Sequence, residues 1–304
     1  MKKVILYVIA VIILCIPAFT GILGSNYLRY GFRIFLYITI GQMWNLLSGY
    51  AGMTSLGQQA FIGLSGYSLA VITSKYGMPY PVGFAAGLAV GIVFALLMSL
   101  LLMRIDGMYF AITTWVVAEA LGTLFLSMTY VNRGAGMTVK AAPYPKIGTL
   151  YIFALILCAL ALIVMHLLLG SEAGLGIRAM HDDTQAAEAA GINVRKLKWI
   201  VYIIAAAFTS LAGSLFFLNK GTIYPESGFD IGWTISMVFI VIIGGAGTIE
   251  GPVAGAVIYV ILSELLAHYP GWSNIILGTI AIIMIIFCPR GITRKIPGIK
   301  RRVG

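Results

Sequence analysis

The sequence predicts an all-α, polytopic membrane protein. Of its 304 residues, 60% are hydrophobic and only 10% carry charge, and the mean hydropathy is +0.99. Apolar runs long enough to cross a bilayer recur along the whole chain, so lipid rather than water is the expected solvent. A soluble domain with a polar surface is excluded, and residues 1–304 are expected to form one transmembrane domain.

The apolar runs predict about ten membrane passes, because a helix needs roughly 20 residues to span the hydrocarbon core. The first run follows Lys2 and Lys3 and is long enough to be an uncleaved helix rather than a signal peptide. The eighth and ninth runs are short and are joined by glycine-rich sequence, which favours broken or re-entrant helices. The runs lie at 4–23, 31–48, 54–74, 80–103, 108–127, 150–169, 199–218, 233–245, 252–268 and 273–288.

The basic residues predict the orientation. With a cytoplasmic N-terminus and ten alternating passes, 13 of the 20 lysine and arginine residues lie inside, as the positive-inside rule requires. Both termini are then cytoplasmic, together with a connector at 170–198 and a basic tail at 289–304. Because the basic residues are scattered rather than interleaved with aromatic side chains, the net charge of +10 does not indicate nucleic acid. The residues predicted to lie outside are Arg29, Arg33, Lys75, Arg133, Lys140, Lys146 and Lys220.

The connector contains the longest charged stretch of the chain, residues 174–191. Asp182 followed by Gln185 is typical of a capping box, in which the Asp side chain accepts a hydrogen bond from the Gln backbone N–H. Residues 184–190 are rich in good helix formers, and Gly191 stands where a left-handed C-terminal cap is expected. The pattern predicts a short rigid helix between two membrane segments. A solvated connector with no partner is the alternative.

Two glycine motifs, at 49–57 and 244–252, share a Gly-x-Ala-Gly core followed by a further glycine. Each ends one apolar run and begins another. Clustered glycines let backbones approach closely and let membrane helices break, so the duplication favours two related halves around a central path. Ordinary glycine-rich helix packing is the alternative. The motif residues are Gly49, Gly52, Gly57, Gly244, Gly245, Gly247, Gly251 and Pro252.

Ionisable residues within the membrane are few. Glu119, Glu250 and Glu264 are the carboxylates, and such groups usually face a pore or a partner. Either an ion-carrying role or a structural hydrogen bond to a neighbouring helix would explain them. The amides Asn45, Gln58 and Gln59 flank the first glycine motif, where they could contact a polar solute or hold helices together.

Motifs for enzyme chemistry are missing from the sequence. It has no G-x-x-x-x-G-K-[ST] phosphate loop, so the chain does not bind ATP in the usual way and must take energy from elsewhere. The three histidines are dispersed, and the three cysteines all lie in apolar runs. We therefore expect no metal, no cofactor and no catalytic residue in this chain.

The stretch Gln185-Ala-Ala-Glu-Ala-Ala-Gly191 resembles the E-A-A-x-x-x-G loop of ABC importer permeases, with glutamine in place of the usual glutamate. Its surroundings resemble the branched-chain amino acid permease family, in particular LivM-type subunits. The resemblance spans roughly residues 30 to 295. It rests on the segments 44–52, 55–61, 107–112, 176–183, 191–194, 244–252 and 289–291.

The resemblance implies a subunit of a heteromeric importer in a bacterial or archaeal cytoplasmic (inner) membrane. The expected partners are a homologous LivH-type permease, two ATPase subunits that bind and hydrolyse ATP, and an extracytoplasmic solute-binding protein. Leucine, isoleucine and valine are the expected solutes, although related permeases carry urea, amides, sugars or nucleosides. An ion-coupled secondary transporter is the rival from another class, but it leaves the Ala-Ala-x-x-x-Gly helix unexplained.

The resemblance gives the connector helix a role in coupling to the ATPases. A helix with small residues on one face can seat in a groove of an ATPase and move with it as a rigid body, while its charged side chains pair with basic groups there. The candidate solute path has few fixed charges, which favours a weak and mostly apolar path. Glu119 and Glu250 are therefore expected to matter for packing more than for solute affinity. The expected coupling residues are Arg178, Asp182, Asp183, Gln185, Ala186, Ala187, Glu188 and Gly191; Ala190 completes the small-residue face.

Overall fold

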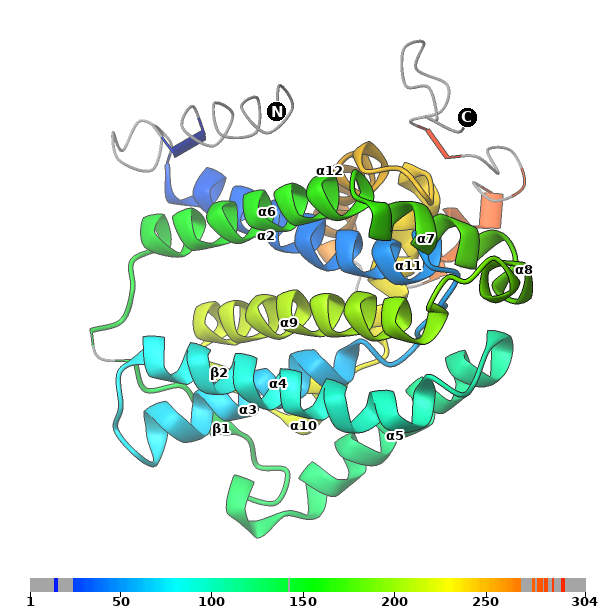
Figure 1. Ribbon diagram of the computed structural model, residues 1–304. Helices are drawn as coiled ribbons and strands as arrows, with labels where there is room; N and C mark the ends of the chain where they lie inside the picture. The colour runs from blue at the N-terminus through cyan, green and yellow to red at the C-terminus, as the bar shows by residue number, and fades with distance from the viewer. Residues whose placement is uncertain are drawn as a thin grey trace.

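The computed structural model describes residues 14–15, 24–141, 143–268, 275–276, 278–280, 282–283, 286 and 291–292. Helices make up most of this part of the chain (Figure 1). The predicted first and last apolar runs, 4–23 and 273–288, and the basic tail lie largely outside the described residues. In order, the elements are α2 (Ser25–Trp44), the π-helical turn η1 (Asn45–Tyr50), α3 (Gln59–Ser74), α4 (Tyr80–Leu102), α5 (Gly107–Ser127), η2 (Thr129–Val131), β1 (Met137–Thr138), α6 (Ile147–Leu169), α7 (Glu172–Asp182), α8 (Thr184–Ala189), α9 (Val194–Lys220), β2 (Thr222–Ile223), α10 (Pro225–Gly228), α11 (Gly232–Gly244), α12 (Glu250–Leu265) and η3 (Leu266–His268).

Five segments of the described chain are long and apolar enough to cross a membrane. They are α4, α5, α6, α9 and the stretch Pro225–Gly244, which contains α10 and α11. A multi-pass, all-α membrane protein is thus confirmed, whereas ten passes and two related halves stay predictions. The run predicted at 54–74 becomes helical only at Gln59, and the run at 31–48 ends in a π-helical turn. Both differences follow from the glycine-rich sequence at 49–57, which breaks the helix.

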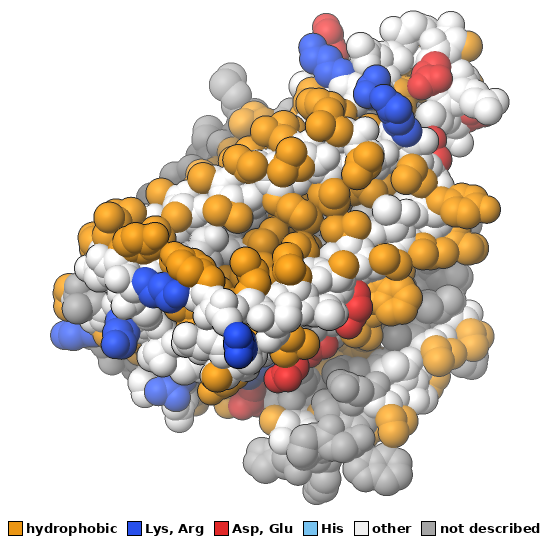
Figure 2. Space-filling view, turned by 90° about the horizontal axis from the view of Figure 1, so that it is seen from below, with side chains coloured by type: hydrophobic (Ala, Val, Ile, Leu, Met, Phe, Trp, Pro, Cys, Tyr) orange, Lys and Arg blue, Asp and Glu red, His pale blue; other side chains and the backbone are white. Residues whose placement is uncertain are grey.

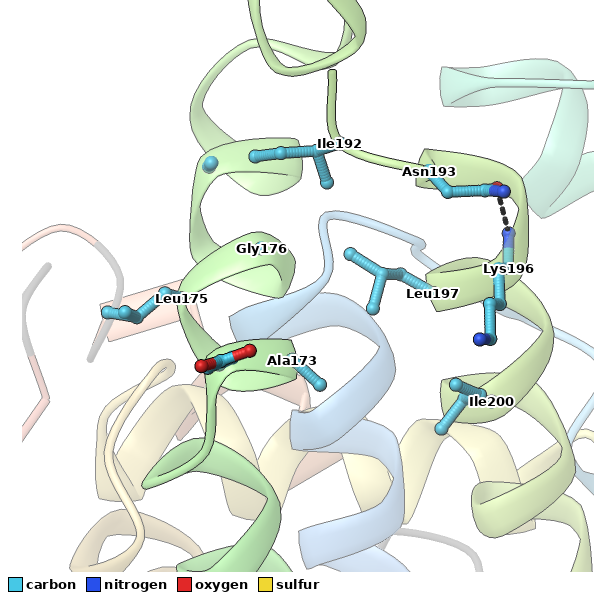
Figure 3. A pocket seen from close by; sticks show the side chains of 10 residues that line it. Ala173, Leu175, Gly176, Ile192, Asn193, Lys196, Leu197 and Ile200 are labelled. Carbon is cyan, nitrogen blue, oxygen red and sulfur yellow. Dashed lines mark hydrogen bonds between the residues drawn. The ribbon is translucent and has the colours of Figure 1, made fainter. Parts of the chain in front are cut away.

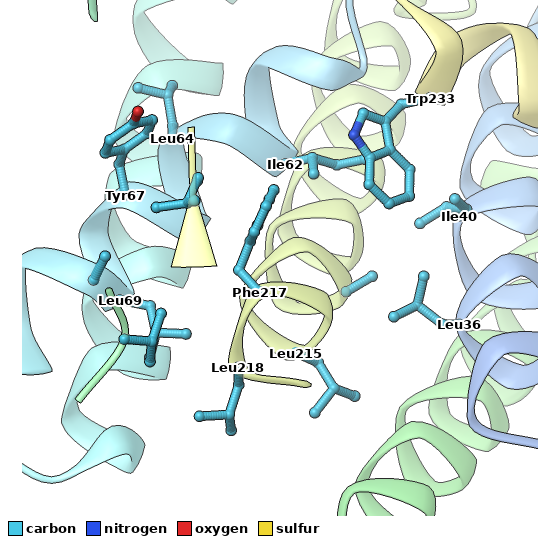
Figure 4. Close-up of a cluster of buried hydrophobic side chains, with 14 of the residues drawn as sticks. Leu36, Ile40, Ile62, Leu64, Tyr67, Leu69, Leu215, Phe217, Leu218 and Trp233 are labelled. Carbon is cyan, nitrogen blue, oxygen red and sulfur yellow. The ribbon is translucent and has the colours of Figure 1, made fainter. Parts of the chain in front are cut away.

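The long helix α9 lies at the centre of the bundle, with α2 and α6 above it and α3 and α4 below it in the view of Figure 1. Its aromatic and aliphatic side chains Leu215, Phe217 and Leu218 are buried. They lie between side chains of α3 on one side and side chains of α2 on the other (Figure 4). Helix α9 thus contacts α2 and η1, which precede and carry the first glycine motif, and its Phe216 packs on Trp233 of α11, the helix that leads to the second motif.

Helix α4 packs closely on α3 and α9 because one face of it is small. The buried positions are Gly83, Gly87, Gly91, Ala95 and Ser99 among others, and these recur every four residues along the helix. A Cβ atom at Gly87 would lie 2.6 Å from the Ser214 hydroxyl oxygen of α9 and 3.1 Å from the Ser65 carbonyl oxygen of α3. Small residues at this spacing allow membrane helices to approach closely, so the opposite face of α4 is left outward.

The loops at one end of the bundle are tied by a two-stranded sheet. Strands β1 and β2 pair antiparallel, with Met137 opposite Ile223 and Thr138 opposite Thr222. The Lys75 ammonium group at the end of α3 donates to the carbonyl of Tyr130 and lies over its ring. Several of the basic residues predicted to lie outside therefore share this end of the molecule, and α7 and α8 lie at the other end (Figure 1).

Candidate functional site

The two glycine motifs meet in the structure. The buried side chain of Asn45, at the start of η1, donates to the Thr248 carbonyl oxygen at 2.8 Å and accepts from the Gly247 backbone N–H at 2.9 Å. The Gln42 amide, one turn earlier, donates to the Ile249 carbonyl. Side-chain amides of the first helix break thus bind the second break, about 200 residues further along the chain. They satisfy backbone groups that no helix satisfies.

Glycine is required on both sides of this contact. A Cβ atom at Gly49 would lie 2.6 Å from the Gly247 nitrogen, and Gly247 itself has a positive φ of 71°. Gly245 adopts a φ of 116°, a conformation that L side chains rarely adopt. Thr248 closes the loop between α11 and α12, since its hydroxyl donates to the Gly245 carbonyl and accepts from the Gly251 N–H. We call this contact region, residues 45–52 and 244–252, the glycine junction.

The second side of the junction is a tight helical hairpin. A Cβ atom added at Gly244 would overlap the carbonyl group of Gly251, and one added at Gly255 would overlap the carbonyl of Ile240. Pro252 is buried at this hairpin, 3.6 Å from where a Cβ atom of Gly41 would lie. The helices α11 and α12 therefore touch backbone to backbone.

The two glutamines after the first motif link helices rather than line an open cavity. Gln58 accepts from the Thr209 hydroxyl of α9 at 3.2 Å, and Gln59 accepts from the Thr234 hydroxyl of α11. Both glutamine side chains are fully buried. Of the two interpretations of these amides, the structure favours the one in which they hold helices together. Gly57 beside them packs against the backbone of Thr114 in α5.

The connector contains two helices where the sequence predicted one. Helix α7 ends at Asp182, and Asp183 is the N-terminal cap of α8. The Asp183 carboxylate accepts from the backbone N–H groups of Gln185 and Ala186 at 2.9 and 3.0 Å. The predicted capping box at Asp182 is thus wrong by one residue, because α7 continues far enough to include Asp182 and the chain turns extended only at Asp183.

The C-terminal end of α8 is confirmed. Gly191 has a φ of 84°, its N–H donates to the Glu188 carbonyl at 2.9 Å, and the Ile192 N–H donates to the Ala187 carbonyl at 3.0 Å. These two bonds form a Schellman motif, which satisfies the last carbonyls of the helix. Nothing lies within 4 Å of a Cβ atom at Gly191, so its backbone conformation, and not crowding, requires glycine there.

We expect Asp183→Ala to loosen α8 and Asp182→Ala to leave it unchanged. Removing the cap leaves two backbone donors without a protein acceptor, which typically costs about 1 kcal/mol. Amide hydrogen exchange over residues 184–190 in the purified protein should accelerate only in the first variant. Equal protection in the two variants would contradict the cap assignment.

Helix α8 presents its other residues to the outside and anchors through one alanine. Ala187 is buried, and it belongs to the core cluster of Met180, Leu197 and Val201. Gln185, Ala186, Glu188 and Ala190 are exposed. The expected face of Ala186, Ala187 and Ala190 is therefore wrong in part, since Ala187 contacts the chain's own core and is not available to a partner.

The connector touches the glycine junction directly. Gly52, with a φ of 70°, would carry a Cβ atom 3.5 Å from both the Cα and the Cδ2 atoms of His181, the next-to-last residue of α7. The Trp44 indole N–H holds the segment after Gly52 by donating to the Ser55 carbonyl at 2.8 Å. Helix α7 thus contacts the first helix break with no element between them.

A groove separates α7 from the start of α9 and has a cavity volume of about 490 Å³. Figure 3 shows Ile192 and Leu197 between the two helices, and the backbone N–H of Lys196 bonded to the Asn193 side chain at 3.0 Å. Near the start of α9, the buried ammonium group of Lys198 is paired with Asp106, which precedes α5. Sequence reasoning did not single out this ion pair, because either residue alone is compatible with a solvated loop.

The three carboxylates predicted within the membrane lie in different surroundings. Glu264 of α12 is paired with Arg33 of α2, a contact between neighbouring helices. Glu250 is half-buried at the first residue of α12, within the glycine junction. Glu119 is exposed on α5 and lies outside the junction. The structure therefore does not bring Glu119 together with the other residues predicted to line a path. Arg178 lies half-buried on α7.

The described chain is a multi-pass bundle of membrane-length helices. Two helix breaks touch within it, and the polar connector contacts the first of them. The chain belongs to the family described as branched-chain amino acid transport system / permease component, whose model matches residues 26–288. It is a transport component of the ABC permease type.

Named relatives agree with this family. The chain is 25% identical over 287 residues to the high-affinity branched-chain amino acid transport system permease protein LivM of Escherichia coli, covering 84% of this chain and 67% of the relative. It is 25% identical over 298 residues to the fructose import permease protein FrcC of Rhizobium meliloti, covering 90% and 82%. It is also 25% identical over 186 residues to the E. coli permease LivH, covering 60% and 58%. No solved structure matches the chain.

Proposed function

We propose that this chain is the permease subunit of an ATP-driven importer that moves leucine, isoleucine and valine, delivered by an extracytoplasmic binding protein. The family match over residues 26–288 carries the proposal, and the similarity to LivM over most of the chain supports it. Similarity to LivH supports a second, homologous permease as partner. Two ATPase subunits complete the proposed assembly and bind the ATP that this chain has no phosphate loop to hold.

The proposed contact with the ATPases is the exposed side of α8. Gln185, Ala186 and Ala190 offer small or uncharged surface, and Glu188 offers a carboxylate for a basic partner group. The helix is fixed at both ends by its cap and its Schellman motif, so it is built to move as a unit. This contact requires α8 to face the cytoplasm, and both termini are proposed to lie on the same side.

Motion of α8 would reach the path through the glycine junction. Because α7 contacts Gly52 and Asn45 bridges to the Gly247 loop, a shift of the connector is passed to two helix breaks at once. Breaks of this kind permit hinge motion that regular helices resist. The junction has few fixed charges, as expected for a path on which selectivity was exercised earlier by a binding protein.

Uptake in proteoliposomes tests this function. The chain would be reconstituted with a LivH-type permease, the two ATPases and the binding protein of the same organism, and uptake of radiolabelled leucine would be measured with ATP inside the vesicles. We expect uptake that needs ATP and every subunit. Uptake that persists without ATP but follows an ion gradient would show a secondary transporter instead.

Fructose import is the second candidate, because a fructose permease matches 90% of this chain. The same vesicles distinguish the two solutes when radiolabelled fructose is offered in place of labelled leucine. ATP-dependent uptake of fructose and not of leucine would overturn the amino acid assignment while leaving the importer class in place.

A further inference from the structure

Helix α5 has an outward face that does not match a lipid-facing surface. Of the five membrane-length segments, α5 is the least buried, with 22% of its apolar window buried inside the chain. The buried residues of α5 are Phe110, Ala111, Thr114 and Ala118, and Leu121 and Phe125 pack against the core on the same side of the molecule as Phe229. The exposed stripe on the other side, which we call the α5 face, consists of Ile112, Trp115, Val116, Glu119, Ala120, Thr123 and Leu124.

Glu119 lies deep within the span. It is the thirteenth of the 21 residues of α5, about 18 Å from the start of the helix at 1.5 Å per residue. At that depth a carboxylate facing hydrocarbon is costly, so such groups face protein or a water-filled cavity. Figure 2 views the molecule from the side on which α5 lies, and apolar side chains cover much of that face, with acidic side chains among them.

Helix α4 provides the contrast. Its outward residues include Val90, Val93, Leu97 and Leu101, and none of its 23 residues carries a charge. That composition suits lipid. The two neighbouring spans thus differ in one respect: the face of α4 is uniformly apolar, whereas the α5 face centres on a carboxylate.

We propose that the α5 face is the surface to which the second, homologous permease subunit binds, with Glu119 paired to a basic or hydrogen-bond-donating side chain of that subunit. This rests on the proposed function, which supplies such a partner. A soluble ATPase or binding protein cannot reach the middle of a membrane span, whereas another membrane permease can. Trp115 and Val116 lie beside Glu119 on the α5 face and supply an apolar contact for the partner. Burial in that contact would strengthen the interaction between Glu119 and the partner side chain.

Two described residues near the ends of the chain contact helices other than α5. Leu14 accepts a hydrogen bond at its carbonyl from the Tyr151 hydroxyl of α6, and Ile292 donates to the Ile243 carbonyl of α11. None of these contacts involves α5. Within the described part of the chain, no residue covers the α5 face, whose side chains are exposed.

Site-specific photocrosslinking tests the proposal. A benzophenone side chain would replace Val116 on the α5 face or Val93 on α4, in membranes that hold the complete transporter. We expect an adduct with the second permease from position 116 and none from position 93. Adducts from position 93 alone, adducts with a second copy of this chain, or no protein adduct from either position would overturn the proposal. If the second permease still co-purifies in the last case, the proposed function stands and only the surface is wrong.

Substitutions of Glu119 give a second readout. Glu119→Gln keeps a hydrogen-bonding side chain and should leave co-purification of the second permease nearly unchanged. Glu119→Lys replaces the carboxylate by an ammonium group, which would repel a basic partner side chain. We therefore expect at least about tenfold less of the second permease to co-purify with each copy of this chain. Thermal stability of the isolated chain should be equal in both variants, because Glu119 is exposed in it. Equal co-purification in the two variants would contradict a paired Glu119.

Discussion

We expect Gly244→Ala to prevent the protein from accumulating in the membrane. The added methyl group would overlap the carbonyl carbon and oxygen of Gly251, which are backbone atoms held in helix α12 and cannot rotate away. Relief therefore requires α11 and α12 to separate, and this also breaks the loop that Asn45 holds. Overpacking a close interface typically costs 1–3 kcal/mol or more, which is a large fraction of the ~5–15 kcal/mol that stabilises a typical protein.

The measurement is the amount of monodisperse protein after mild detergent extraction, followed by a fluorescent fusion on a sizing column. Gly24→Ala is the matched control, since nothing lies within 4 Å of a Cβ atom at Gly24 and its φ of −56° suits any residue. We expect at least about tenfold less folded protein for Gly244→Ala than for the control. Similar amounts of the two variants would show that α11 and α12 are not in backbone contact.

Hydrophobic runs and glycines predicted much of this fold from the sequence alone. The runs at 80–103, 108–127 and 150–169 correspond closely to α4, α5 and α6, because uninterrupted apolar sequence leaves the backbone no alternative to a helix in lipid. Gly191 was predicted as a left-handed cap, since no other residue in its neighbourhood adopts that conformation easily. Signals of this kind are local, so they can be read without tertiary information.

The connector shows where local signals are insufficient. Gly174 and Gly176 are poor helix formers, and the sequence therefore did not predict α7. In the structure both glycines are needed for close packing: a Cβ atom at Gly174 would lie 2.6 Å from the Leu168 carbonyl oxygen, and one at Gly176 would lie 2.7 Å from the Leu197 side chain. Once α7 forms, Asp182 is its last residue, and the cap of α8 moves to Asp183.

Contacts between distant segments could not be predicted from one sequence. Both glycine motifs were recognised as helix breaks, yet nothing in their residues indicates that Asn45 bonds to Thr248, 203 positions away. The ion pair between Lys198 and Asp106 is similar, because either residue alone is compatible with a solvated loop. Such pairs depend on how α9 packs against its neighbours, which is decided by the whole core.

Tryptophan substitutions on α8 should separate its attachment from its proposed contact with the ATPases. Ala187 is buried against the core and Ala190 is exposed. Ala187→Trp should displace α8 from the chain, because the core has no room for an indole ring. Ala190→Trp leaves α8 in place but projects the ring from its outer side. We expect both variants to insert normally and to lose uptake of the labelled solute by at least about tenfold.

The two losses should differ in cause. Amide exchange over residues 184–190 should accelerate in Ala187→Trp and stay unchanged in Ala190→Trp, whereas co-purification of the ATPase should fall in both. Ala89→Trp on the exposed face of α4 is the control for ring size, and it should retain uptake and ATPase. Normal uptake and ATPase binding in Ala190→Trp would remove the outer side of α8 from the coupling contact. Because α7 touches Gly52, a displaced α8 that left uptake intact would also show that motion does not pass from the connector to the glycine junction.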